Sequence, residues 1–286
     1  MKEIVISSYS KINLILNILD RYEDGYHEIE TIMQSINLAD KVTISEEDKE
    51  EIKIECNNPQ VPVHNRSLAY KSAEKILKKY KVGRGVKIKI DKNIPIAGGM
   101  AGGSANSAAI LVGINRIFNL NLSNEDLREM GEELGMDIPF CIQNGTALAF
   151  HKGEKIVHLP PITPPLWIIV INPGFKISTQ WAYNNIDLRK TKKGRNNIEA
   201  MLVALKRGIS GEIAKNLFNS FEELIIKKYP EVGRIKDKLV DAGALGTLMS
   251  GSGPTVFGIM QNKEEALKVY EKLKQQYKLI WLVHTI

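Results

Sequence analysis

The sequence predicts an α+β fold in two parts, an N-terminal domain over residues 1–160 and a C-terminal domain over residues 161–286. Strand-like and helix-like stretches mix along the whole chain, without the strict alternation of a doubly wound sheet. Hydrophobic residues make up 43% and charged residues 25%, so the chain can form a core of ordinary size. A domain boundary is expected where four prolines separate two strand-like stretches, at Pro160, Pro161, Pro164 and Pro165.

The first part combines strand patterns with three helical regions. Runs rich in Val, Ile and Leu, or alternating apolar and polar residues, predict strands at 3–19, 41–44, 51–55, 86–90 and 146–150. Apolar residues at helical spacing predict helices at 67–80, 105–118 and 124–134. Ser123 and Asp126 have the spacing of a capping box, which indicates where the last of these helices begins.

The second part follows the same rules. Strands are expected at 167–172, 245–250, 255–260 and 279–283. Helices are expected at 197–206, 211–218, 221–227, 231–242 and 263–275. The sequence contains no internal repeat and no low-complexity segment.

Charge and cysteine content narrow the function classes. The formal net charge is +6, and much of the excess lies in the clusters Lys78–Lys79, Arg189–Arg195 and Lys227–Lys228. No aromatic residues interleave with these clusters, which disfavours a nucleic-acid partner and favours a polyanionic small ligand. Cys56 and Cys141 are too few, and lack the CxxC spacing, for a disulfide framework or a zinc site. We assign no side chain of this sequence as a metal ligand.

The N-terminal residues run directly into a strand pattern with no long apolar stretch after it. Neither a signal peptide nor a transmembrane helix is expected. We therefore expect a cytoplasmic protein with no membrane partner.

A glycine-rich loop between a strand and a helix is the first candidate site. Glycine lets a backbone approach a ligand closely, and free N–H groups at a helix N-terminus attract anions. The loop lacks the Gly-Lys-Ser/Thr ending of a Walker A sequence, and a close-packed turn without a ligand is the alternative interpretation. Its candidate nucleotide-binding residues are Pro95, Ile96, Ala97, Gly98, Gly99, Met100, Ala101, Gly102, Gly103, Ser104, Ala105 and Asn106.

Lys11 and Asp137 are the candidate chemical groups. Lys11 interrupts an apolar strand pattern, so it either faces solvent or is held in a site, and Asn13 projects from the same face. Asp137 precedes Pro139, a pattern that favours a helix cap but leaves one carboxylate oxygen free to take a proton from a hydroxyl. A phosphate cradle, a cation and a proton-handling group are together what phosphoryl transfer needs.

Three segments of the chain resemble the three motifs of the GHMP kinases, which act on galactose, homoserine, mevalonate and phosphomevalonate. They are Ser10–Leu14, Ile94–Ala109 and Leu248–Phe257, in the family's order and over nearly the whole chain. The resemblance implies the GHMP kinase fold, with an N-terminal ATP-binding domain, a C-terminal α+β domain and the active site in the cleft between them. It also implies ATP as phosphoryl donor, with Mg²⁺ carried by the ATP phosphates, and a monomer or weak homodimer.

Two shorter runs point to one branch of the family. Asp24–Glu28 and Gly135–Phe140 resemble the branch that phosphorylates a cytidine diphosphate derivative of methylerythritol on its 2-hydroxyl, in the non-mevalonate isoprenoid precursor pathway. The alternatives are a GHMP kinase of homoserine or mevalonate type, or a GHMP-fold protein that binds a ligand without catalysis.

The resemblance also assigns roles to individual residues. Lys11 and Asp137 match the catalytic pair, and Asn13 matches a substrate contact. The cytidine is expected to contact Tyr26, His27 and Tyr183. Without the family, Tyr26 and His27 would be interpreted as part of a turn with a half-buried histidine, and Tyr183 as a core residue.

The chain departs from the family pattern at two places. Ala101 stands where glycine is common, so its methyl group could alter the loop geometry. Near the nucleoside the family often has an asparagine, where this chain offers Ser67, with Asn65 two residues earlier. The third motif, Ser250–Gly253, is expected to support the glycine loop by close backbone packing and not to contact phosphate.

Overall fold

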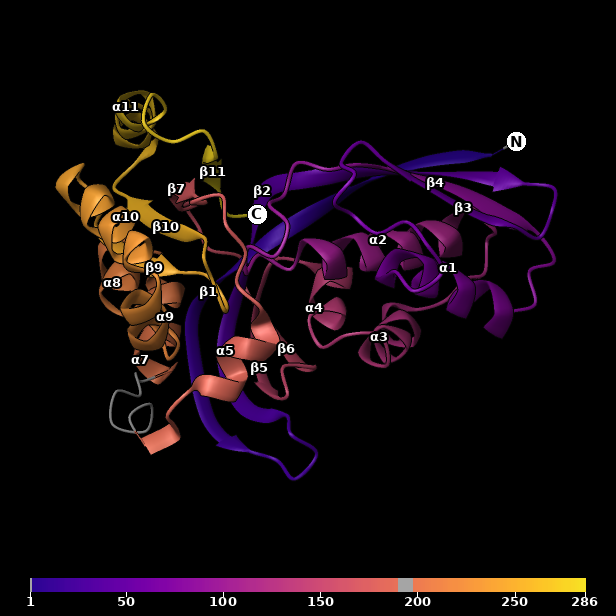
Figure 1. Ribbon diagram of the computed structural model, residues 1–286, viewed down its shortest axis with the longest axis horizontal. Helices are drawn as coiled ribbons and strands as arrows, with labels where there is room; N and C mark the ends of the chain where they lie inside the picture. Colours follow the sequence, from indigo (N-terminus) through magenta and orange to yellow (C-terminus); the bar gives the residue numbers. More distant parts are fainter. Residues whose placement is uncertain (1, 190–197) are drawn as a thin grey trace. The chain divides into compact units, whose positions relative to one another are not determined.

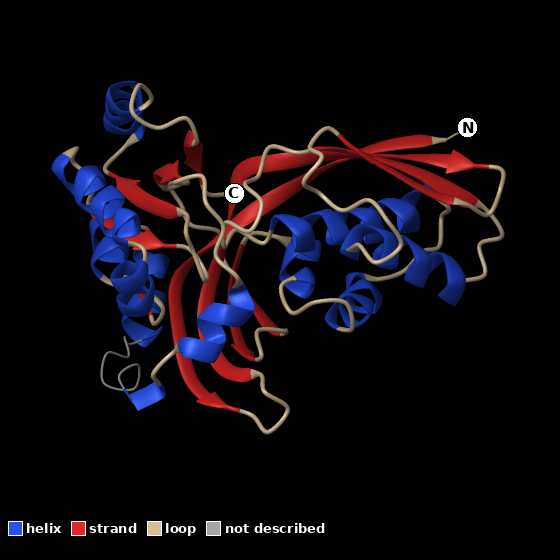
Figure 2. Cartoon of the chain, in the orientation of Figure 1, coloured by secondary structure: helices blue, strands red, loops and turns tan. Residues whose placement is uncertain are grey.

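A computed structural model describes residues 2–189 and 198–286 (Figure 1). Contacts divide the chain into two compact units that do not follow the chain order. Unit 1 contains the residues up to Ser10, together with Leu38–Ile96 and Ala101–Asn144. Unit 2 contains Lys11–Asn37, Ala97–Met100 and the chain from Gly145 onward. Helices and strands occur in both units, which confirms the α+β class. Figure 2 shows the mixture of helices and strands in the chain.

Two long strands supply residues to both units. They are β1 (Glu3–Arg21) and β2 (His27–Glu47), neighbours in a seven-stranded sheet whose main path runs β3-β4-β2-β1-β8. In unit 1, β4 (Gly85–Asp91) lies antiparallel to β2, with Ile44 opposite Ile88, and parallel to β3 (Ile52–Cys56).

Four helices complete unit 1: α1 (Leu68–Lys79), α2 (Gly102–Ile117), α3 (Asn124–Glu132) and α4 (Ile138–Gln143). The capping box predicted at Ser123 and Asp126 is confirmed at the start of α3. Helix α2 approaches β2 closely through Gly113, where a β-carbon would lie 2.3 Å from the Cδ1 of Ile44. This contact fixes α2, and with it the helix end that follows the glycine loop.

Unit 2 contains the remaining strands of the first sheet and a second sheet. β5 (Thr146–His151) pairs with β2 and with β6 (Lys155–Leu159), and β8 (Phe218–Asn219) pairs in parallel with β1. The second sheet has the order β11-β7-β10-β9. Its strands are β7 (Trp167–Ile171), β9 (Gly246–Met249), β10 (Val256–Met260) and β11 (Ile280–His284).

The helices of unit 2 pack on the second sheet and on one another. One buried cluster joins Ile169 and Val256 of the sheet with Phe221 and Leu239. The helices are α5 (Thr179–Asn185), α7 (Ile198–Arg207), α8 (Ser210–Lys215), α9 (Glu222–Lys228), α10 (Pro230–Asp241) and α11 (Lys263–Leu273). Within the described ranges, none of the chain's helices is long and apolar enough to cross a membrane.

The prediction of a helix over 211–218 was wrong at the C-terminal end of the helix. Helix α8 ends at Lys215, and Phe218 and Asn219 pair with β1. The Asn219 side chain donates to the carbonyls of Met249 (2.7 Å) and Gly251 (2.8 Å), contacts that a local periodicity cannot reveal. Most of the basic cluster that begins at Arg189 lies outside the described residues.

Candidate functional site

The glycine loop follows β4 and opens α2, as the sequence predicts. Three of its residues have positive φ angles: Ala97 (52°), Gly99 (74°) and Ala101 (55°). Ala101 thus adopts the left-handed conformation that glycine prefers, at a cost of roughly 1–2 kcal/mol. As the N-cap of α2 it offers no side-chain acceptor, so the first N–H groups of the helix have no side-chain cap there and suit an anion.

The third motif supports the loop by backbone packing, which confirms this part of its prediction, and the expected lack of a phosphate contact stays a prediction. The Ser250 hydroxyl donates to the Gly99 carbonyl at 2.9 Å. A β-carbon on Gly99 would lie 2.1 Å from the Ser250 carbonyl oxygen, so only glycine fits there. Gly251 and Gly253 also have positive φ angles, 55° and 81°, which form the tight turn that brings this carbonyl to the loop.

Lys11 is buried and does not face solvent. Its side chain is 5% exposed, and its Nζ donates to the Asn13 Oδ1 at 2.7 Å, which confirms that the two residues share one face. Asn13 in turn donates to the Thr31 hydroxyl at 2.8 Å. The Lys11 backbone N–H donates to the Met100 carbonyl of the glycine loop at 3.2 Å.

The Lys11 ammonium has no ion-pair partner among the described residues of unit 2. A buried charge that lacks a counter-ion is costly, because burial removes the water that solvates it. A contact between Lys11 and an anionic group stays a prediction.

Asp137 occupies the N-cap position of α4, but its side chain makes no capping hydrogen bond. The capping bond favoured from the sequence was therefore wrong. The residue has helical dihedral angles (φ −85°, ψ −12°) instead of the extended ones of a usual N-cap, and Pro139 removes one of the amides that a cap would bind. The half-buried carboxylate is not used to start the helix.

Ser67 and Asn65, the two candidates near the nucleoside, differ in their surroundings. The Ser67 hydroxyl is buried and caps α1 by accepting from the Tyr70 N–H at 3.2 Å. Asn65 is exposed in the loop before that helix. The hydroxyl of Ser67 thus has a structural partner, and its contact with the nucleotide stays a prediction.

Two of the expected cytidine contacts lie together in unit 2. The His27 ring is buried at 5% exposure, and its centroid lies 5.0 Å from that of Tyr183. Tyr183 also packs edge-on against Phe221 at 4.9 Å. Burial lowers the pKa of His27, and repulsion from Arg21 acts in the same direction, so the imidazole is held in its neutral form.

Tyr26 presents an exposed ring on the turn that joins β1 to β2. The side chain is 50% exposed, and the Nζ of Lys152 lies 4.9 Å from the ring centroid. Lys152 also forms an ion pair with Asp24, which accepts a hydrogen bond from the Tyr26 N–H at 3.0 Å. Sequence reasoning missed Lys152, because it comes from the distant turn between β5 and β6.

The first turns of α2 contain polar atoms that lack partners. Within residues 2–189 and 198–286, the Asn106 Oδ1 and the Ser107 Oγ are buried without a hydrogen bond. No group of three or more His, Cys, Asp or Glu side chains is arranged there as metal ligands.

The comparisons with known proteins agree over both halves of the chain. Residues 67–145 match the family model of the GHMP kinases N terminal domain, and residues 201–279 match that of the GHMP kinases C terminal. A 4-diphosphocytidyl-2-C-methyl-D-erythritol kinase of Caldicellulosiruptor bescii is 45% identical over 280 residues, 98% of this chain and 97% of that protein. This chain belongs to the GHMP kinase family.

Solved structures of GHMP kinases share the fold. A 4-(cytidine 5'-diphospho)-2C-methyl-D-erythritol kinase superposes with a TM-score of 0.83 at 28% identity, over 99% of each chain. A homoserine kinase of Cytophaga hutchinsonii superposes with a TM-score of 0.76 at 20% identity, over 100% of this chain and 95% of the other. The two family models lie on either side of residue 160, and the boundary itself stays a prediction.

Proposed function

We propose that this GHMP kinase transfers a phosphoryl group from ATP to the 2-hydroxyl of 4-diphosphocytidyl-2-C-methyl-D-erythritol, giving the 2-phosphate and ADP. The observation that carries this assignment is the 45% identity, over nearly the full length of both chains, with a kinase of that name. The reaction belongs to the non-mevalonate isoprenoid precursor pathway. The likeness to homoserine kinase, at 20% identity, supports the fold alone.

The glycine loop is proposed to hold the ATP phosphates, over residues 95–106. The uncapped start of α2 supplies N–H groups and the positive end of the helix dipole. The buried Asn106 Oδ1, which has no hydrogen-bond partner in the described part of the chain, supports a contact with the ligand itself. Mg²⁺ is proposed to arrive with the ATP phosphates, where it would offset their negative charge.

Lys11 and Asp137 are proposed as the catalytic residues. The half-buried Asp137 carboxylate, which does not cap its helix, would accept the proton of the 2-hydroxyl. The buried Lys11 ammonium would stabilise negative charge on the transferring phosphoryl group. Asn13, which accepts a hydrogen bond from Lys11, would hold that ammonium in place and contact the substrate.

The cytidine is proposed to bind beside the turn between β1 and β2. The neutral His27 ring and Tyr183 offer adjacent aromatic faces, and Tyr26 offers an exposed ring. The net charge of +6 suits a substrate that is itself a diphosphate. A cytoplasmic location, a monomer or weak homodimer, and the lack of a nucleic-acid partner stay predictions from the sequence.

The test is ADP release from Mg²⁺-ATP with this acceptor, beside homoserine and mevalonate at equal concentration. We expect turnover with the cytidine-containing acceptor alone, and competitive inhibition against that acceptor by added cytidine nucleotides. Turnover with homoserine or mevalonate instead would leave the family intact and overturn the substrate. Binding of ATP without turnover of any acceptor would point to a ligand-binding protein.

A further inference from the structure

A buried ion pair lies just before the glycine loop, and none of the roles proposed above uses it. The Asp40 side chain on β2 is 0% exposed and that of Lys92 is 5% exposed. The Nζ of Lys92 lies 2.8 Å from the Asp40 Oδ2. Both residues belong to unit 1. Burying two charges is costly, so a buried ion pair is weak evidence for stability by itself.

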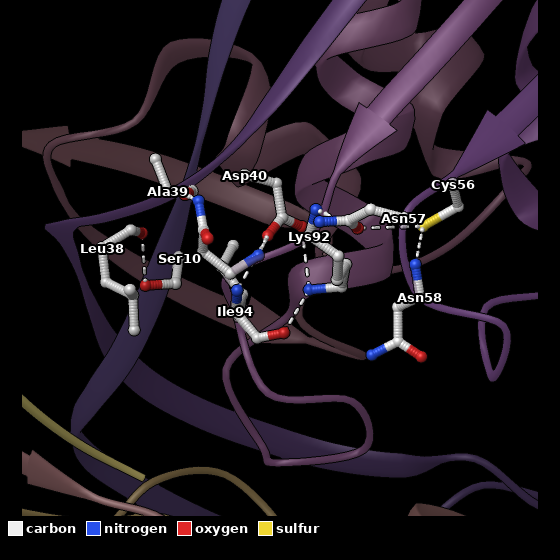
Figure 3. Close-up of polar contacts among 10 residues, drawn as sticks. Ser10, Leu38, Ala39, Asp40, Cys56, Asn57, Asn58, Lys92 and Ile94 are labelled. Carbon is white, nitrogen blue, oxygen red and sulfur yellow. Dashed lines mark hydrogen bonds and ion pairs between the residues drawn. The ribbon is translucent and has the colours of Figure 1, made fainter.

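The same carboxylate holds the backbone where the loop begins (Figure 3). The Asp40 Oδ1 accepts hydrogen bonds from the N–H groups of Asn93 (2.7 Å) and Ile94 (2.8 Å). The Nζ of Lys92 donates to the Ile94 carbonyl, and the Lys92 N–H donates to the Asn57 Oδ1 at 2.8 Å. The three residues before Pro95 are therefore fixed through both their backbone and their side chains.

Lys92 extends this arrangement to the other end of the loop. A β-carbon on Gly102, the first residue of α2, would lie 3.2 Å from the Lys92 Nζ and 3.0 Å from the Ile94 Cγ2. A buried ammonium thus lies beside a helix N-terminus, which carries partial positive charge itself. Burial lowers the pKa of Lys92, and the Asp40 carboxylate opposes this effect only in part.

We propose that Asp40 is a positioning residue for nucleotide binding. It fixes the entry of the glycine loop directly, through the amides of Asn93 and Ile94. It fixes the start of α2 through Lys92. Both ends of the loop then share one anchor, and the N–H groups proposed to bind phosphate keep their spacing. This role rests on the proposed binding of ATP at the loop.

The first test compares Asp40→Asn with the parent enzyme. Asparagine keeps an oxygen for the two amides but removes the charge that pairs with Lys92. We expect the KM for ATP and the Kd for ATP, measured by calorimetry without acceptor, to rise about tenfold or more. The KM for the acceptor should stay within about twofold, since the proposed role of Asp40 concerns the glycine loop alone.

Asp126→Asn is the matched control. It makes the same substitution in the same unit and removes the capping-box carboxylate of α3. It should lower the melting temperature without changing the Kd for ATP. The proposal would be overturned if the Kd for ATP rose equally in Asp126→Asn and in Asp40→Asn. Equal increases would mean that Asp40→Asn weakens ATP binding through general destabilisation of the fold.

A second pair of variants separates positioning from charge balance, and does not depend on Asp40→Asn being stable. In a Lys92→Met background, Asp40→Asn and Asp40→Ala differ in whether an oxygen remains for the Asn93 and Ile94 amides. We expect the alanine variant to bind ATP at least about fivefold more weakly than the asparagine variant. Equal Kd values for ATP would mean that Asp40 only neutralises Lys92, and would overturn the positioning role.

The Gly103→Leu variant distinguishes two hypotheses. One is that ATP binds at the glycine loop, and the other is that Asp40 positions that loop. A β-carbon on Gly103 meets nothing within 4 Å, so a leucine side chain there would begin in open space at the loop. Gly211→Leu is the control, since that glycine of α8 is equally open. If Gly103→Leu leaves the Kd for ATP unchanged, the loop is not the site and the Asp40 proposal fails with it. If Gly103→Leu abolishes binding and Asp40→Asn changes nothing, only the role of Asp40 is overturned.

Discussion

Lys11 is buried, whereas most lysines in folded proteins are exposed to solvent. It belongs to the buried stretch of β1, and its ammonium donates a hydrogen bond to the side-chain oxygen of Asn13. Neutral amide oxygens solvate an ammonium less well than water does, so the folded chain gives up free energy to keep this charge buried. Such a cost at one residue is typical of catalytic and binding groups.

Replacing Lys11 by methionine should therefore separate activity from stability. We expect kcat to fall about a hundredfold or more, because charge on the transferring phosphoryl group loses its partner. The melting temperature should stay the same or rise, because a buried charge is replaced by an apolar chain of similar length. Calorimetry and ADP release measure the two effects.

Lys268→Met, at an exposed lysine of α11, is the control and should change neither. A loss of activity that merely follows a loss of folded protein would contradict the catalytic role.

His27 makes stability depend on pH in a defined direction. Burial puts its folded-state pKa below the ordinary value of 6.5, so the unfolded chain binds more protons at mildly acidic pH. The contribution of the neutral ring to stability is complete above about pH 6.5 and is lost as the pH falls from there through the folded-state pKa.

The free energy of unfolding, measured by urea titration between pH 7.5 and about pH 5, should therefore decrease less in His27→Gln than in the parent. His64→Gln, at an exposed histidine, provides the comparison and should retain the full decrease. Identical pH profiles for the parent and His27→Gln would rule out the buried neutral ring as the cause.

At the scale of elements, helix α2 connects the core of unit 1 to the proposed nucleotide site. Its position on β2 depends on Gly113, because the space for a β-carbon is already filled by the Ile44 Cδ1 at 2.3 Å. Gly113→Ala should lower the free energy of unfolding by about 1–3 kcal/mol through overpacking, despite the better helix propensity of alanine.

The Ile44→Val substitution removes the atom that collides, so it should partly rescue Gly113→Ala. By itself Ile44→Val should cost about 0.5–1.5 kcal/mol, and the double variant should be more stable than the sum of the single effects predicts. Gly211→Ala, in an open helical position, should be neutral or stabilising. Urea unfolding of the four variants tests this packing, and strict additivity would contradict it.

At the same scale, local patterns predicted some features well and others poorly. The helix after the glycine loop and the capping box of Ser123 and Asp126 were predicted because their signals lie within a few residues. The first half of β2 was missed, since its pairing with β5 is made by residues far away in the chain. The Asp137 cap was wrong because the backbone of that residue is helical, which the Asp-x-Pro pattern does not reveal.

For the whole molecule, the family motifs predicted more than periodicity could. They placed Lys11, the glycine loop and Ser250–Gly253 in one function before any contact between them was known. In the structure, two carbonyls of the loop accept hydrogen bonds from these segments. The Met100 carbonyl accepts from the Lys11 N–H, and the Gly99 carbonyl accepts from the Ser250 hydroxyl. The Asp40–Lys92 pair escaped prediction, because neither residue stands out in the sequence until the fold buries both.

The net charge is a property of the whole chain, and it predicts how the enzyme captures its substrates. The protein has a net charge of +6, and both proposed substrates, ATP and a diphosphate acceptor, are polyanions. Long-range electrostatic attraction should therefore increase the rate at which they bind. At low acceptor concentration, kcat/KM should fall severalfold as KCl rises from about 50 to about 500 mM, because the Debye length shortens to a few ångströms. The kcat at saturation should change much less, since bound substrate no longer depends on long-range attraction.

A neutral osmolyte of matched viscosity is the control for slower diffusion. If kcat/KM does not respond to salt, the positive excess contributes to solubility alone, and substrate capture depends on the local contacts of Lys11 and the glycine loop.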